Sequence, residues 1–249
     1  WWSRGHGSLV DTPDGRWYII YHAYENGYYS LGRQTLLEPV ELTDDGWFKP
    51  VDGLDIAGEI PMPLPEVSFD RKAHLNEFRI GYEWRYYRDF DKERASVKDG
   101  VLTLKAQGHT PADSAPIMFI AGDHSYEFSV EIDKSPDATA GLVLYYNKSF
   151  FTGTGVDKSG IYRYQKGFVE RWTEFDNQTH FWLKLRNDHH IVTGFYSFNG
   201  QDWIQMSWGQ EISGFNHNTI DGFQSVLPGL MAAGDGYVNF SNLEYTKLD

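Results

Sequence analysis

Three side chains near the start of the chain have the types that a hydrolytic serine triad needs. His6, Ser8 and Asp11 lie close together in the sequence. In hydrolases of that kind a strained turn between a strand and a helix exposes the serine hydroxyl. Ser8 instead precedes the apolar pair Leu9 and Val10, which is typical of a strand, and the strand-to-helix turn is missing. We therefore expect no serine-hydrolase chemistry from this grouping.

Two further groupings could hold an ion or a phosphate. His189 and His190 are adjacent, but neighbouring residues of a strand point to opposite faces, and the ligand spacing of a zinc site is absent. Residues 153–157 are rich in glycine, yet the helix and lysine of a phosphate-binding loop do not follow. We expect neither site, and we expect residues 153–157 to form a mobile loop.

Aromatic side chains offer a chemistry suited to sugars. Tyr145, Tyr146, Phe150 and Phe151 surround Asn147, and an aromatic face packs well against the apolar side of a pyranose or furanose ring. Phe150 and Phe151 are therefore candidate substrate-binding residues. The alternative is that these rings belong to a core, which the period-two alternation favours for about half of them.

The first fifty residues predict a meander of antiparallel strands. Strand-like runs cover residues 8–11, 17–24 and 36–42, and the turns at 13–15 and 44–46 contain the Pro, Asp and Gly that tight turns favour. Such a meander is the unit of a propeller blade, and one blade cannot bury both of its faces alone. We expect residues 1–53 to belong to an incomplete β-propeller whose other blades precede Trp1.

The remainder predicts a linker followed by a β-sandwich, so that the whole chain is all-β. Residues 54–66 contain three alternating prolines, which enforce an extended, semi-rigid connection. From residue 67 to residue 249, apolar and polar residues alternate in evenly spaced segments, and Asn199 with Gly200 gives a hairpin signal. Segments of this kind form two sheets around one core. They cover residues 100–106, 126–132, 141–146, 181–186, 193–198 and 237–245.

Composition limits the classes of partner. The net charge of -13 argues against nucleic acid, because binding phosphates requires clustered Lys and Arg. The absence of cysteine excludes disulfides and thiolate metal sites. No apolar run approaches the roughly 18 residues that span a bilayer. A periplasmic or extracellular bacterial location is compatible with these features, and so is the cytoplasm.

Two sets of segments resemble glycoside hydrolase family 43. Residues 4–10, 17–22 and 31–33 resemble the last blade of the family's five-bladed propeller. Residues 112–127, 186–192 and 213–218 resemble the concanavalin-like, jelly-roll sandwich that follows it in the β-xylosidase and α-L-arabinofuranosidase members. The two pieces also occur in the family's order.

The resemblance implies roles for two side chains. His6 matches a histidine that reaches the propeller axis beneath the sugar pocket, where it helps to hold a water or a cation such as Ca²⁺. Arg33 matches an arginine that binds the terminal pentose. The family's catalytic Asp, Asp and Glu match nothing in this chain and are expected upstream. Inverting hydrolysis requires an acid and a base about 6.5 to 9.5 Å apart.

The expected function is therefore that of the C-terminal part of an inverting exo-glycosidase. Its substrate would be a xyloside or arabinofuranoside in hemicellulose fragments, and the chain alone would be inactive. The alternatives are a sandwich that binds carbohydrate without chemistry and a sandwich that only clamps the propeller. The closing strand reads Asn239-Phe240-Ser241-Asn242, without the aspartate that holds calcium in some related sandwiches, so an ion is not expected there.

Overall fold

The computed structural model describes residues 1–54, 58–61, 63–65, 68, 70–87, 91–175 and 177–248. The chain packs as two compact units. The first unit is Trp1–Phe69 with Asn216–Ser225, and the second is Asp70–Phe215 with Val226–Asp249. Residues 55–57, 62 and 66 of the expected linker lie outside the described residues.

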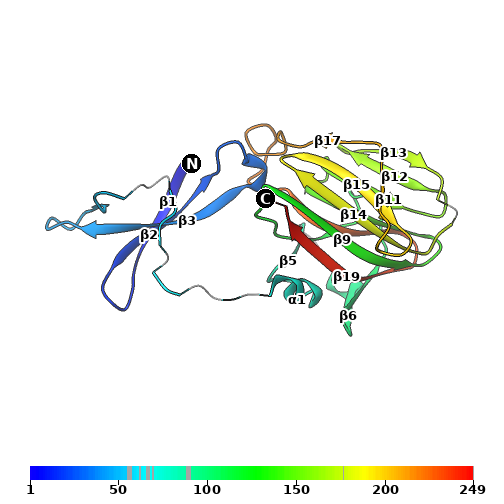
Figure 1. Cartoon of the computed structure of the whole chain (residues 1–249), viewed down its shortest axis with the longest axis horizontal. Helices are drawn as coiled ribbons and strands as arrows, with labels where there is room; N and C mark the ends of the chain where they lie inside the picture. The colour runs from blue at the N-terminus through cyan, green and yellow to red at the C-terminus, as the bar shows by residue number, and fades with distance from the viewer. Residues whose placement is uncertain are drawn as a thin grey trace. The chain divides into compact units, whose positions relative to one another are not determined.

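The first unit is a four-stranded antiparallel sheet in chain order (Figure 1). Its turns contain Gly15 and Gly46 at φ +83° and +82°, values that a residue without Cβ adopts at little cost. Strand β2 has the bounds that the sequence predicts, and β3 begins three residues earlier than predicted. The elements are β1 (Trp2–Asp11), β2 (Trp17–Tyr24), the short 3₁₀ helix η1 (Tyr29–Leu31), β3 (Arg33–Leu42) and β4 (Phe48–Pro50).

This sheet leaves much apolar surface uncovered. Trp2 and Trp47 are 52% and 69% exposed, and nearly all of β1 is accessible. A single sheet with so little packed against it buries little apolar area, as expected for a single blade. Further exposed apolar residues are Leu9, Val10, Ile20 and Leu42.

The second unit contains two antiparallel sheets (Figure 1). The first sheet has the order β13 (Phe168–Thr173), β12 (Ile161–Gln165), β11 (Phe150–Val156), β10 (Ala138–Asn147), β18 (Leu227–Gly234), β8 (Ile117–Phe119), β5 (Trp84–Tyr86). The second sheet has the order β16 (Ile204–Gln205), β15 (Ile191–Ser197), β14 (His180–Asp188), β9 (Ser125–Lys134), β19 (Tyr237–Lys247), β7 (Val101–Lys105), β6 (Ala95–Lys98), and β17 (Gln210–Glu211) also pairs with β15.

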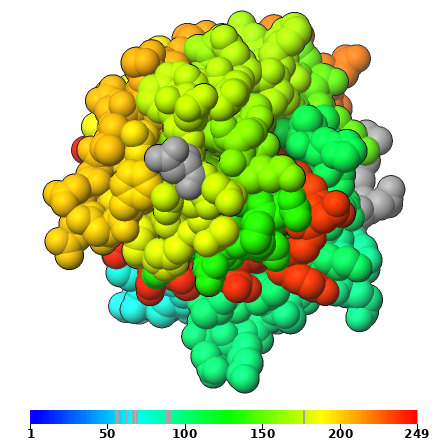
Figure 2. Space-filling view, turned by 90° about the vertical axis from the view of Figure 1, so that its right-hand side faces the viewer, coloured from blue at the N-terminus to red at the C-terminus, as the bar shows by residue number. Residues whose placement is uncertain are grey.

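The core lies between these sheets. Strand β10 is buried almost throughout and contacts β9, β14 and β19 of the opposite sheet. Leu142 and Leu144 on β10, Leu183 on β14 and Phe240 on β19 are all fully buried. The predicted all-β sandwich with one core is therefore confirmed. The hairpin of β6 and β7 protrudes from the edge of this unit (Figure 2).

Two short helices accompany the sandwich. Helix α1 (Arg71–Asn76) begins after Asp70, whose carboxylate accepts a hydrogen bond from the Ala73 amide at 3.0 Å. The 3₁₀ helix η2 (Lys92–Arg94) precedes β6. Neither helix, nor any other in the described part of the chain, is long and apolar enough to cross a membrane.

Two local expectations from the sequence were wrong. The glycine-rich residues at 153–156 belong to β11 instead of forming a mobile loop. A Cβ on Gly155 would lie 2.1 Å from the Tyr164 hydroxyl, so this glycine allows a tyrosine ring to lie against the sheet. His189 and His190 form the two-residue turn between β14 and β15, both with positive φ, instead of lying in a strand.

Candidate functional site

One face of the first sheet gathers the side chains that the sequence singled out. Tyr24 on β2 pairs with Arg33 on β3, and His22 pairs with Thr35. Directly paired residues of antiparallel strands share a face, as do residues two apart on one strand. His22, Tyr24 and Arg33 therefore lie on the same face of the sheet.

An irregularity in β1 brings His6 to this face. The register of β1 against β2 shifts on both sides of Gly5, and His6 has φ +58°. A β-bulge redirects the side chain that it contains. The His6 ring lies 6.1 Å from the His22 ring, centroid to centroid. His6 itself is exposed, whereas Nδ1 of His22 is shielded from solvent and has no hydrogen-bond partner among the described residues.

The guanidinium of Arg33 lies against aromatic rings. Its Cζ is 4.1 Å from the centroid of Phe223 and 5.8 Å from that of Tyr24. Within the described residues the side chain of Arg33 makes no hydrogen bond or ion pair. Cation–π contact holds a guanidinium by its faces. Its N–H donors, which lie in the plane, therefore stay available to a ligand.

Phe223 comes from a segment that the sequence did not connect with this site. Residues Asn216–Ser225 lie between β17 and β18 in the chain but pack with the first unit. His217 of this segment stacks on Tyr24 with ring centroids 5.0 Å apart. Gly32 has φ +74°, and a Cβ there would lie 2.9 Å from Cβ of Ser225. The only signal in the sequence was that Phe223 directly follows a polar, turn-forming stretch of Asn, Asp and Gly, where an aromatic residue is less expected.

The buried carboxylate of the first unit faces the other way. Glu38 is 8% exposed and accepts a hydrogen bond from the Tyr21 hydroxyl at 3.1 Å. Burial and this carboxylate together raise the pKa of Tyr21. Tyr21 alternates with His22 along β2, so Glu38 lies on the opposite face from Arg33. Over the described ranges, no carboxylate pairs with Arg33 or His6.

The described residues do not fit a calcium site at His6. Ca²⁺ takes six to eight oxygen ligands, chiefly carboxylates and carbonyls. No group of three or more His, Asp or Glu side chains that could hold a metal occurs in the part of the chain that the structure describes. His6 offers a nitrogen, and its ring neighbour His22 offers another. Calcium at this position stays a prediction, and its oxygen ligands would have to come from elsewhere.

Phe150 and Phe151 lie in the second unit and differ in accessibility. Phe151 is fully buried in a cluster with Tyr145, Tyr164 and Met231. Its ring therefore has no free face for a sugar, and it packs in the core as the alternative interpretation held. Phe150 is half-buried and packs against Phe215 in a T-shaped arrangement with ring centroids 5.7 Å apart.

Comparison with protein families matches both parts of the chain. Residues 1–48 match the model of glycosyl hydrolases family 43. Residues 73–246 match that of the β-xylosidase C-terminal concanavalin A-like domain. The second match covers well over half of the chain.

Individual relatives agree with these matches. A xylosidase/arabinosidase of Butyrivibrio fibrisolvens is 38% identical over 163 residues, which cover 57% of this chain and 31% of that protein. A putative β-xylosidase of Xylanibacter ruminicola is 26% identical over 227 residues, or 79% of this chain and 39% of that one. The chain thus spans about a third of the length of these curated relatives.

Solved structures show the same fold. A family 43 protein of Bacillus licheniformis superposes with a TM-score of 0.84 at 24% identity, covering 98% of this chain and 53% of that one. A xylan β-1,4-xylosidase of Bacillus halodurans gives 0.82 at 19% identity, with the same two coverages. On the family matches, the chain belongs to glycoside hydrolase family 43 and contains the β-xylosidase C-terminal concanavalin A-like domain.

Proposed function

We propose that this chain forms the C-terminal part of an exo-acting, inverting hydrolase that removes xylose or arabinofuranose from hemicellulose fragments. The matched relatives are described as xylosidases and arabinosidases, which supports a pentoside substrate. In this proposal the three catalytic carboxylates belong to a part of the protein outside this chain.

The observation that carries the proposal is that the guanidinium of Arg33 lies against aromatic rings and has no ion-pair partner within the described residues. A guanidinium that makes no ion pair within the described residues, and whose faces lie near two rings, has donors free in one plane. Arg presents these donors as a rigid fork, which suits two neighbouring hydroxyls of a sugar. The exposed ring of Phe223 beside it offers an apolar surface to the sugar's C–H groups.

The exposed apolar surface of the first sheet supports the proposal that further propeller blades, carrying the catalytic carboxylates, pack against it. Trp2, Leu9 and Ile20 are 38% to 52% exposed, and apolar faces of this extent pack against another sheet in stable folds. Further blades would cover these faces and bring an acid and a base near Arg33. The positive guanidinium would then keep the base ionised, because a nearby opposite charge favours the charged form of a carboxylate.

Hydrolysis of p-nitrophenyl β-D-xyloside and p-nitrophenyl α-L-arabinofuranoside tests the proposal. The 249-residue chain should release no nitrophenol above background, and the chain extended by its natural upstream sequence should be active. In the extended protein, Arg33→Ala should lower kcat/KM by roughly 100-fold, because two hydrogen bonds from a charged group contribute about 3 kcal/mol. Proton NMR of the first product should show the inverted anomer.

Arg16 provides a matched control. It also lies over a tyrosine, with Cζ 5.9 Å from the centroid of Tyr18, but it forms an ion pair with Asp14 at 2.7 Å. Arg16→Ala should leave kcat/KM within about twofold, since its exposed ion pair faces no ligand. Activity of the isolated chain, or equal losses for the two arginine variants, would show that the proposal is wrong.

A further inference from the structure

The aromatic contacts around Arg33 form a closed cycle of four side chains. His217 stacks on Tyr24 at 5.0 Å with the ring planes 23° apart, and it lies 4.9 Å from the Phe223 ring. Phe223 contacts Arg33, and Arg33 lies over Tyr24. His217 therefore joins Phe223 to Tyr24 of the sheet, in addition to the contact of Phe223 with Arg33.

The members of this cycle differ in burial. Tyr24 is 1% exposed and Phe223 is 69% exposed. An exposed phenylalanine on an irregular segment samples several rotamers unless a neighbour selects one. Apart from the Arg33 guanidinium, the ring neighbour of Phe223 in the described chain is His217.

The segment is also held at its far end. The end of the segment lies close against the turn that precedes Arg33, because a Cβ on Gly32 would lie 2.9 Å from Cβ of Ser225. His217 holds the beginning of the same segment, so Phe223 lies between two anchors. Removing the His217 ring would leave the approach of Ser225 to Gly32 and the turn hydrogen bonds of Asn216 intact, and would remove the ring contact of Phe223 with the stacking partner of Tyr24.

The polar atoms of His217 are not needed for this contact. Its Nδ1 is shielded from solvent and makes no hydrogen bond to any residue that the structure describes. Stacking is therefore the interaction that the ring contributes, and a phenyl ring of similar size should replace it.

We propose that His217 is a positioning residue that holds Phe223 against the guanidinium of Arg33 and so fixes the direction of the Arg33 donors. This inference rests on the proposed function for its meaning, since it assigns those donors to a sugar. The contact itself can be tested without any sugar or catalysis.

The experiment is NMR of the Arg33 Nε–Hε group in the complete 249-residue chain. The rings of Phe223 and Tyr24 should shift this proton upfield from the position of an exposed arginine. His217→Ala and Phe223→Leu should each remove at least half of that displacement. His217→Phe should keep most of it, which a role for the imidazole nitrogens would not allow. His109→Ala, at an exposed histidine of the second unit, is the control and should change nothing.

Each outcome decides the inference. An unchanged Arg33 signal in His217→Ala, or an equal loss in His217→Phe, would overturn it. If His217→Ala does not fold, the other two variants still decide, because both keep the segment's remaining contacts. A further combination is that the Arg33 proton responds to the variants as expected while the protein extended by its upstream sequence hydrolyses no pentoside. That combination would reject the proposed function and keep the positioning role of His217.

Discussion

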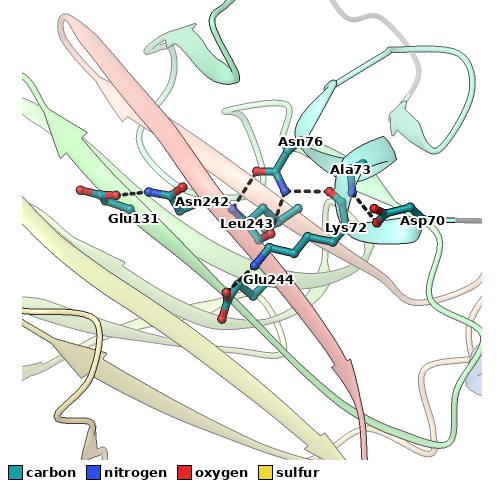
Figure 3. Close-up of polar contacts among 8 residues, drawn as sticks. All are labelled: Asp70, Lys72, Ala73, Asn76, Glu131, Asn242, Leu243 and Glu244. Atoms are coloured by element: carbon teal, nitrogen blue, oxygen red, sulfur yellow. Dashed lines mark hydrogen bonds and ion pairs between the residues drawn. The ribbon is translucent and has the colours of Figure 1, made fainter.

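Asn76 replaces a missing strand partner in the second unit, and its removal has a calculable cost. The register of β19 against β9 shifts between Ser241 and Glu244, so Leu243 does not pair with β9 there. The Asn76 side chain donates to the Leu243 carbonyl at 2.9 Å and accepts from the Leu243 amide at 3.0 Å (Figure 3). Leu243 itself is fully buried.

Asn76→Ala would leave both of these backbone groups without their partner. An unsatisfied buried group costs about 1 to 3 kcal/mol. Asn76 is half-buried, so water should replace part of the lost hydrogen bonding. We therefore expect a cost of about 1 to 2 kcal/mol for each backbone group. The opening free energy at Leu243 should therefore fall by about 2 to 4 kcal/mol, which corresponds to amide exchange that is roughly 30 to 900 times faster.

Hydrogen exchange of the Leu243 amide measures this directly. Lys72→Met is the control on the same helix, because it removes the ion pair to Glu244 at 2.7 Å, in which both side chains are more than half exposed. Such a pair contributes at most about 1 kcal/mol. If Asn76→Ala accelerated exchange no more than Lys72→Met, Asn76 would not be the partner that stabilises the irregular part of β19.

Two further predictions concern the second unit. Gly155→Ala should lower the thermal midpoint by several degrees, because its Cβ would lie 2.1 Å from the buried Tyr164 hydroxyl, whereas Gly122→Ala, with no atom within 4 Å, should change it little. Burial raises the pKa of four tyrosines above the usual 10.0, so the folded state favours their neutral form. The contribution of these tyrosines to stability should be constant below pH 10.0 and fall above it, and absorbance at 295 nm should show these groups ionising only together with unfolding; their titration in the native state would contradict this. The four are Tyr126, Tyr145, Tyr164 and Tyr245.

Local pattern was enough to predict most strands but not the role of every glycine. Residues 17–24 form a short run rich in aromatic and β-branched residues that is bounded by turn residues, so β2 could be predicted to the residue. In β11 the glycines at 153 and 155 look like loop residues in sequence. A Cβ on Gly155 would meet the ring of Tyr164 on the next strand, and a Cβ on Gly153 would meet the backbone of Leu142 on β10, so both requirements come from neighbours in the sheet.

In the candidate site, too, the residues close together in the sequence could be predicted and the distant ones could not. The family resemblance singled out His6 and Arg33, and the structure places both on one face of the first sheet. The resemblance assigned His217, within residues 213–218, to the sandwich and did not indicate Phe223, although both pack with the first unit and lie more than 180 residues from Arg33 in the chain. Nothing in a single sequence connects such distant residues, because their contact follows from the packing of the segment as a whole.

Comparison with Arg186 shows what Arg33 gains from being held by aromatic rings instead of by a carboxylate. Arg186 directs Nε and Nη2 at one oxygen of Glu127, at 3.1 and 2.8 Å, so its donors are consumed and its charge is compensated. A guanidinium fixed in that way could not bind a neutral sugar without giving up stronger partners. Contact with Phe223 and Tyr24 orients Arg33 through its π faces and uses none of its in-plane donors. Replacing Phe223 by a carboxylate should therefore orient Arg33 equally well and remove its capacity to bind hydroxyls.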